Sequence, residues 1–209
     1  MTQASLKGMY GADNPFTVFI VYDTAVLAQQ YLLAFGSESD KQRWGLKMNF
    51  GSLQSFFRQA RVSTNDQVAA LTNIPYLVTM SYTGGGVKVA ASQPIYLNGK
   101  NLVDLGFGGT ATGEALIPNE PPVTLGSRLG GNDKYTGLIS EVIFYNRLLS
   151  APERQAVEAY LAQKWLEEAY KSGCQELEDA GETSDGNYVI DPDGYNGPAA
   201  SQEVYCDFP

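Results

Sequence analysis

The chain has 209 residues, of which 44% are hydrophobic and 18% charged, with 22 glycines and 10 prolines. This suits one large domain with an appendage, or two modest domains, and excludes a disordered tail. The net charge of −9 opposes binding to nucleic acid or to an anionic membrane surface. The absence of histidine excludes Ser-His-Asp and Cys-His catalysis and His-ligated zinc. Chemistry based on a carboxylate pair or a hard cation stays open.

Residues 15–146 show the pattern of an all-β domain, because short runs of β-branched and aromatic residues alternate with Gly, Asn, Asp or Pro. Residues 16–22 are apolar on both faces, as expected for a central strand between two layers. Asn98-Gly99 predicts a tight hairpin, flanked by Leu97 and Leu102. Residues 106–122 are expected to form a long loop. Further strands are predicted at residues 31–35, 44–50, 54–60, 76–82, 123–126 and 138–145.

The last of these strands has two different faces. Since side chains alternate along a strand, one face carries Leu138, Ser140, Val142 and Phe144, and we expect it to be core. The other face carries Glu141 among apolar residues. A glycoside hydrolase requires a pair of carboxylates, and Glu141 has no second acid beside it. The sequence therefore favours a charge paired with the following helix, or a solvated face, over catalysis.

One helix is indicated after this strand, at residues 151–170. Ser150 and Glu153 have the spacing of a capping box, and Pro152 lies in the first turn. An apolar stripe is predicted to pack against the sandwich, and Gly173 to terminate the helix. The stripe consists of Val157, Tyr160, Leu161 and Trp165.

Cys174 and Cys206, the two cysteines, lie in a Gly- and Asp-rich stretch without partner ligands for a metal site. A disulfide is therefore expected, and it indicates a location outside the reducing cytoplasm. No apolar run approaches the roughly 18 residues that cross a bilayer, and residues 1–15 lack signal-peptide features. The composition changes near residues 171–173, which predicts two modules, 1–171 and 172–209.

The segment from Tyr135 to Trp165 closely resembles the end of the laminin-G-like, concanavalin A-like domains of bacterial surface proteins. It has a Gly-bounded strand with Glu-Val-x-x-Tyr-Asn-Arg and a Leu-Ser capped helix that ends in Lys-Trp. Residues 15–21, the 96–99 hairpin and Leu125-Gly126 extend the resemblance over most of residues 5–168. It implies a jelly roll of two antiparallel sheets. The family's first strand, with its acidic motif, is shortened or missing, so no calcium site on that motif is implied.

Residues 174–209 resemble the opening of a fibrinogen C-terminal domain. The resemblance implies that Cys174 and Cys206 are disulfide-bonded across a small hairpin, closing a loop that contributes about 3 to 4 kcal/mol. The family's larger subdomain, with its calcium site and ligand pocket, is not covered, so its ligand binding is not implied. The matching segments are Cys174-Gln-Glu-Leu, Ser184-Asp-Gly-Asn-Tyr, Ile190-Asp-Pro-Asp-Gly and Glu203-Val-Tyr-Cys-Asp.

Three aromatic residues near predicted strand ends or loops, Trp44, Tyr82 and Tyr135, are candidates for stacking on sugars, with rim packing as the alternative. Asn132 and Asp133, in the turn that follows Gly130, are candidates for contact with a glycan or Ca²⁺, with a plain turn as the alternative.

An oxygen-rich loop formed by Asp191, Asp193 and Asn196 is the candidate metal site. An EF-hand loop needs its glycine at position six, but Gly194 falls at position four, so an EF-hand is excluded. The alternative is an Asp-Pro-Asp-Gly turn. Ca²⁺ is the one cofactor that the sequence leaves open.

Together these features predict an all-β protein: an antiparallel jelly-roll β-sandwich with one C-terminal amphipathic helix and a small disulfide-linked β-hairpin appendage. The favoured function is a non-catalytic binding or adhesion module, secreted or at the cell surface, within a larger surface or pilus-associated protein that has flanking domains. Its partner would be a glycan or a surface protein, with no nucleic acid and no membrane insertion. The first alternative is a structural spacer, and a glycan-cleaving enzyme is less favoured.

Overall fold

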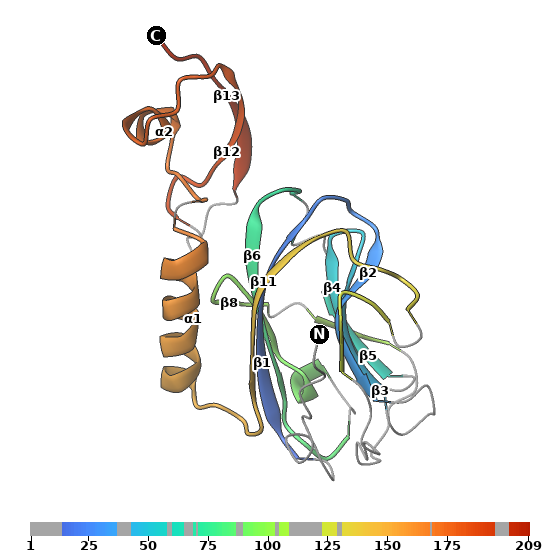
Figure 1. The fold of residues 1–209 in the computed structure, drawn as a ribbon. Helices are drawn as coiled ribbons and strands as arrows, with labels where there is room; N and C mark the ends of the chain where they lie inside the picture. Colours follow the sequence, from blue (N-terminus) through green and yellow to red (C-terminus); the bar gives the residue numbers. More distant parts are fainter. Residues whose placement is uncertain are drawn as a thin grey trace.

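The computed structural model describes residues 14–36, 43–57, 60–64, 69, 71–86, 90–102, 105–108, 123–128, 131–167, 169–194 and 201–209. Two antiparallel sheets pack against each other, α1 (Ala151–Trp165) covers the outer side of one of them, and a small unit follows α1 (Figure 1). None of the helices among the described residues has the length and hydropathy of a membrane span.

The sheets confirm the predicted β-sandwich. The five-stranded sheet has the order β11 (Gly137–Tyr145), β1 (Phe16–Thr24), β6 (Pro75–Tyr82), β7 (Ile95–Leu97) and β8 (Lys100–Asn101). The six-stranded sheet has the order β10 (Val123–Leu125), β2 (Gln29–Gly36), β3 (Arg43–Asn49), β4 (Ser52–Phe57), β5 (Ala60–Thr64) and β9 (Leu105–Gly108). A short 3₁₀ turn, η1 (Ala90–Ser92), precedes β7.

Two parts of the sandwich differ from the prediction by more than a shift of one or two residues at a strand end. The single strand expected over residues 54–60 is two strands, because β4 ends at Phe57 and β5 begins at Ala60. The loop expected from residue 106 begins inside β9, which pairs with β5. The predicted hairpin is confirmed: Asn98 and Gly99 both have positive φ, and Leu97 pairs with Lys100 instead of Leu102. This is the backbone geometry that an Asn-Gly turn favours.

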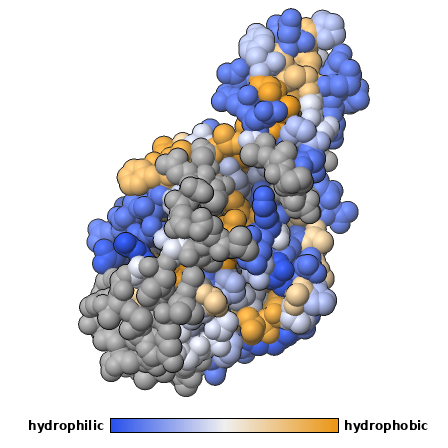
Figure 2. Space-filling model, turned by 180° about the vertical axis from the view of Figure 1, so that it is seen from behind, coloured by the Kyte–Doolittle hydropathy of each residue, from blue (hydrophilic) through white to orange (hydrophobic). Residues whose placement is uncertain are grey.

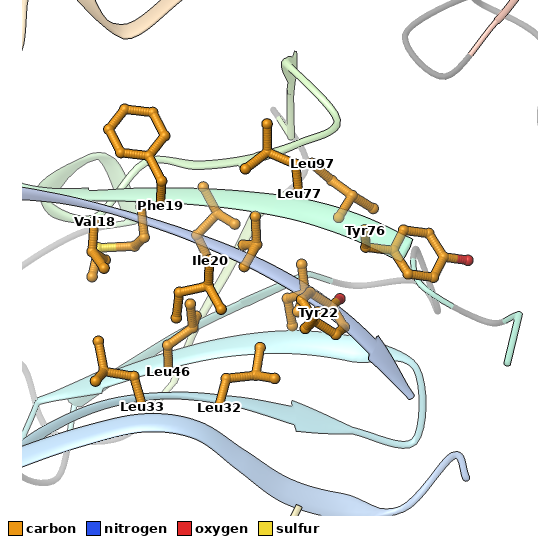
Figure 3. Packing of buried hydrophobic residues seen from close by; sticks show 14 of the residues in the cluster. Val18, Phe19, Ile20, Tyr22, Leu32, Leu33, Leu46, Tyr76, Leu77 and Leu97 are labelled. Atoms are coloured by element: carbon orange, nitrogen blue, oxygen red, sulfur yellow. The ribbon is translucent and has the colours of Figure 1, made fainter. Parts of the chain in front are cut away.

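Strand β1 is the centre of the core and is buried on both faces. Phe16, Ile20 and Tyr22 point into the sandwich, where Phe16 lies edge-on to Trp44 at 5.1 Å between ring centroids. Phe19 lies on the opposite side of the strand from Ile20 (Figure 3). It contacts the ring of Tyr145 in β11 at 6.0 Å. Because other parts of the protein cover both sides of β1, this strand has no polar face.

The predicted core face of β11 is wrong for the first half of the strand, because the strand contains a β-bulge. Val21 pairs with Glu141 but the next residue of β1, Tyr22, pairs with Ile139, so Ser140 is an extra residue. Because side chains alternate, this insertion reverses the facing of the residues before it. Leu138 is therefore 65% exposed, and Ser140 is exposed too. Beyond the bulge the prediction holds, since Phe144 stacks on Phe16 at 5.2 Å.

Helix α1 begins as predicted and ends earlier. The Glu153 carboxylate accepts a hydrogen bond from the backbone N–H of Ser150 at 2.9 Å, and it pairs with Arg147 at 2.8 Å. The helix ends at Trp165, while Gly173 caps the next helix, α2 (Cys174–Asp179).

The buried side of α1 differs from the predicted apolar stripe. Tyr160 is 51% exposed, whereas Arg154 and Glu158 are buried together with Leu161. Arg154 and Glu158 form an ion pair, and the Arg154 guanidinium lies 3.7 Å from the centroid of the Tyr96 ring. Mutual pairing allows two charged residues to occupy the sheet-facing side, which a count of apolar residues cannot detect.

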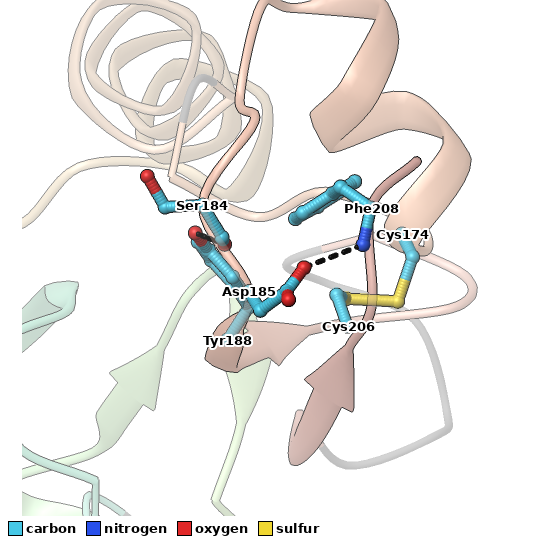
Figure 4. The surroundings of a disulfide bond; sticks show 6 residues. All are labelled: Cys174, Ser184, Asp185, Tyr188, Cys206 and Phe208. Atoms are coloured by element: carbon cyan, nitrogen blue, oxygen red, sulfur yellow. Dashed lines mark hydrogen bonds between the residues drawn. A yellow bond between two sulfur atoms is a disulfide. The ribbon is translucent and has the colours of Figure 1, made fainter.

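Residues 172–209 are called the knob. Its described part consists of α2 and an antiparallel pair, β12 (Gly186–Ile190) and β13 (Gln202–Cys206). The predicted disulfide is confirmed: it joins the first residue of α2 to the last of β13, with 5.6 Å between the Cα atoms (Figure 4). The knob projects from the sandwich, and the face in Figure 2 shows it as largely hydrophilic. Asp191 N–H donates a hydrogen bond to the Lys171 carbonyl at 2.8 Å, which connects the knob to the segment that precedes it.

Candidate functional site

Two of the predicted sugar-stacking residues belong to the core. Tyr82 is only 1% exposed, and its hydroxyl accepts a hydrogen bond from Gly86 N–H at 2.8 Å. Trp44 is fully buried and donates its indole N–H to Ser55 and Gln93. Both residues lie on the inner faces of their strands, so neither ring is available to a ligand. For these two residues the structure corrects the prediction in favour of packing.

Tyr135 holds a loop in place. Its hydroxyl donates to the Asp23 carbonyl at 2.6 Å, and its backbone N–H donates to the Gly126 carbonyl at 2.8 Å. The half-buried ring lies edge-on to Tyr22. Burial raises the pKa of its phenol well above the ordinary value. These contacts give Tyr135 a structural role at the end of β1.

Asn132 and Asp133 lie at the edge of the six-stranded sheet. The Asn132 carbonyl accepts a bond from Arg128 N–H at 2.8 Å, and the Asp133 carbonyl accepts one from Tyr31 N–H at 3.1 Å. Asp133 has φ +48°, a conformation that Asp adopts more readily than most residues. Gly130 lies outside the described residues. The turn therefore brings Asp133 next to Tyr31 of β2, a neighbour that the sequence did not indicate, while Asn132 contacts Arg128.

Tyr31 begins a row of cross-strand partners on the outer face of the six-stranded sheet, the side away from the other sheet. It pairs with Lys47 of β3, which pairs with Gln54 of β4, and the row continues through Ser63 of β5 to Gly106 of β9. Residues paired directly across antiparallel strands share a face. Their chain neighbours Leu46 and Met48 are buried in the core. The row therefore lies on the outer side of the sheet; its polar groups are half-buried, and Tyr31 is buried at 5% exposure.

A second row runs beside the first, through Ala34, Gly45, Phe56, Arg61 and Gly108. The rings of Phe56 and Tyr31 meet edge to face at 5.3 Å, which connects the two rows. A Cβ atom on Gly45 would collide with the Phe56 ring, and one on Gly108 would lie 2.8 Å from Arg61 Nε. Glycine at these two positions therefore lets the ring and the guanidinium lie close against the sheet.

Two cations distinguish this face in a chain of net charge −9. Lys47 Nζ donates to Gln29 Oε1 at 3.3 Å and lies 5.9 Å from the Tyr31 ring centroid. Arg61 is exposed and has no ion-pair partner among the described residues. A guanidinium binds carboxylates through two parallel hydrogen bonds. The described positions of the two rows include no Asp or Glu, so the arrangement suits binding an anionic polar ligand.

Glu141 lies on the α1 side of the five-stranded sheet and is paired with the helix. Its carboxylate accepts a hydrogen bond from Trp165 Nε1 at 2.7 Å and one from Lys164 Nζ at 2.9 Å. These two bonds lower the pKa of Glu141 below its ordinary value. The predicted pairing with the helix is confirmed, and this carboxylate fixes α1 to β11.

We expect Glu141→Gln to lower the free energy of unfolding by about 1 kcal/mol at pH 7. Because the folded-state pKa is lowered, the stabilisation is complete above the unfolded pKa of about 4.3 and is lost as pH falls through the folded value. Urea unfolding at pH 7 and pH 3 measures it. Glu203→Gln, at an exposed position of the knob, is the matched control. A Glu141→Gln deficit that is equally large at both pH values would contradict the ion-pair explanation.

Asp191 and Asp193 lie in a turn at the base of the knob. Asp191 is 3% exposed; its Oδ2 accepts a bond from Ser201 at 3.0 Å, and its Oδ1 has no hydrogen-bond partner among the residues that the structure describes. Burial raises the pKa of this carboxyl above its ordinary value. Gly194 N–H donates to the Asp191 carbonyl at 3.0 Å, as in the alternative Asp-Pro-Asp-Gly turn. The described residues contain no cluster of three or more potential metal ligands, Asn196 lies outside them, and calcium binding here stays a prediction.

Comparison with known proteins identifies the fold but no family. No protein-family model matches the chain, and no curated protein matches it. Among solved structures, it is similar to the CBM40 of a Ruminococcus gnavus IT-sialidase bound to α2,3-sialyllactose. The two chains are 18% identical with a TM-score of 0.52, and the match covers 70% of this chain and 83% of the other. A Trypanosoma rangeli sialidase is 19% identical with a TM-score of 0.53, over 73% of this chain and 23% of the sialidase.

At this identity the similarity concerns architecture alone. It supports the β-sandwich fold that the strand pattern predicts. The laminin-G-like, concanavalin A-like assignment and the fibrinogen-like interpretation of residues 172–209 stay predictions.

Proposed function

We propose that this protein is a non-catalytic carbohydrate-binding module that binds an acidic glycan on the outer face of its six-stranded sheet. The observation that carries the proposal is Arg61: an exposed guanidinium held against Gly108 and paired across the strands with Phe56, whose ring is buried with that of Tyr31. Lys47 supplies a second positive charge one row away. Sugars with a carboxylate offer the anion that this face would bind, and the amides of Gln29, Asn49 and Gln54 suit the hydroxyls of such a sugar.

The solved structure of similar fold supports the choice of ligand class, since the Ruminococcus gnavus module is bound to α2,3-sialyllactose. The disulfide supports a location outside the reducing cytoplasm, secreted or at the cell surface. Adhesion within a larger surface protein is part of the same proposal. A structural spacer is less favoured because it gives no reason to place Lys47 on this face and to hold the exposed Arg61 against Gly108. A glycan-cleaving enzyme is less favoured because Glu141 is bound to the helix.

We expect Arg61→Ala to weaken binding of α2,3-sialyllactose about 10- to 100-fold, because a charged hydrogen bond is lost. Arg61→Lys keeps the positive charge but lacks the planar guanidinium, so its affinity should lie between those of the wild type and Arg61→Ala. Lys100→Ala, at an exposed position of β8 in the other sheet, is the matched control and should bind like the wild type. Isothermal titration calorimetry with sialyllactose and with neutral lactose measures the affinities. If the wild type binds neither sugar, or if Arg61→Ala binds as tightly as the wild type, the proposal is wrong.

A further inference from the structure

Phe50 occupies an unfavourable position in the turn between β3 and β4. Asn49 and Ser52 close the hairpin, and the two residues between them, Phe50 and Gly51, have φ of +52° and +86°. Two-residue turns of this kind prefer Asn, Asp or Gly at both positions, because a bulky side chain is strained at positive φ. Packing does not compensate for this strain, since Phe50 is 56% exposed. An aromatic ring that is both strained and exposed points to a role outside folding.

The turn lies at one end of the outer face described above. Gln29, Asn49 and Ser52 are cross-strand partners and form a third row, two residues beyond Lys47 in β3. The hydrogen bond from Lys47 to Gln29 connects this row with the first. Phe50 directly follows the third row in the chain, and its backbone N–H donates to the carbonyl of Ala28, the residue before Gln29, at 3.4 Å.

The length of this face suits more than one sugar unit. Each residue of a strand advances the chain by about 3.3 Å, so neighbouring rows are about 7 Å apart and the row of Arg61 lies about 14 Å from the row of Asn49. An acidic sugar bound at Arg61 leaves the rest of this length to further units of the same glycan. A neutral pyranose has an apolar face that packs on an aromatic ring and a rim of hydroxyls that bind amides.

We infer that Phe50, with Gln29 and Asn49, forms a second subsite, on which a neutral sugar unit of the bound glycan stacks. The inference rests on the proposed function, because it requires the acidic unit to bind at Arg61. It assigns the two ends of the face to different chemistry: the guanidinium end binds the anion, and the turn end binds an uncharged ring.

The test uses variants that improve the turn while removing the ring. Phe50→Asn and Phe50→Gly should raise the melting temperature by about 2 to 4 °C, because both residues accept positive φ. They should weaken binding of α2,3-sialyllactose about 3- to 10-fold. Binding of a methyl sialoside, a single acidic sugar, should stay unchanged. Phe50→Trp should retain the affinity for sialyllactose.

The results separate this inference from the proposed function. If Phe50→Asn and Phe50→Gly bind sialyllactose as the wild type does, the second subsite is wrong, while a loss of binding in Arg61→Ala still supports the proposed function. The subsite is also wrong if Phe50→Trp loses as much affinity as Phe50→Gly, because then the turn and not the ring matters. If the wild type binds neither probe, both proposals are wrong.

Discussion

Replacing Trp44 with alanine is expected to lower the free energy of unfolding by about 3 to 5 kcal/mol, the usual cost of removing a large buried aromatic ring. The Trp44 ring lies between Phe35, at 4.8 Å, and Phe16 of the opposite sheet, at 5.1 Å between centroids. Its removal would leave a cavity across the contact that joins the two sheets. Urea unfolding followed by circular dichroism measures the loss.

A Trp44→Phe variant separates packing from hydrogen bonding. It retains a ring but leaves Ser55 and Gln93 without the indole donor, which should cost about 1 to 3 kcal/mol. Equal losses in the two variants would mean that the hydrogen bonds, and not the cavity, dominate. Sialyllactose affinity should be unchanged in Trp44→Phe, because the outer face is built from the alternate residues of β3.

Removing the disulfide is expected to unfold the knob and to leave the sandwich folded. In the chain-entropy model, a bridge between residues 32 apart in sequence stabilises by about 3 to 4 kcal/mol. The knob has little core to offset the loss: among its described residues, only Ile190, Asp191 and Cys206 are buried. Hydrogen exchange of the β12 and β13 amides in a Cys174→Ser, Cys206→Ser variant measures the local loss.

Two readouts decide whether the effect is local. Amides of β1 and β6 should keep their protection in the double variant, and the affinity for sialyllactose should stay that of the wild type. If β1 exchanges as fast as β12, the knob and the sandwich unfold as one unit, and the prediction of two modules is wrong. A Glu203→Gln variant, at an exposed position of the knob, controls for nonspecific effects of substitution.

Local patterns were sufficient to predict most of the secondary structure. Strand β1 is apolar on both faces because both are covered, and the hairpin at Asn98 follows from the positive φ that Asn and Gly accept. The capping residues of α1 act within four positions of each other. Each of these features depends on residues that are close in sequence, so it can be predicted from the sequence alone.

The candidate site depends on register, which local patterns do not determine. Arg61 reaches Gly108 only because β5 pairs with β9, a strand more than forty residues later in the chain. The same limit explains the error at Leu138, because a single extra residue at Ser140 reverses the facing. A signal was nevertheless present: in β3 to β5 the residues that alternate with the core are mostly amides, serines and cations, with Gly45 and Phe56 between them. Such a face, read as a whole, favours binding over mere solvation.

The buried ion pair between Arg154 and Glu158 determines where α1 sits on its sheet. The pair is matched to one location, where the guanidinium covers the Tyr96 ring beside the Asn98 hairpin. A helix displaced by one turn would retain much of its apolar contact but would leave a buried charge without compensation, at a cost of several kcal/mol. Apolar packing alone tolerates sliding. The ion pair excludes the shifted arrangements and so selects a single alignment of helix and sheet.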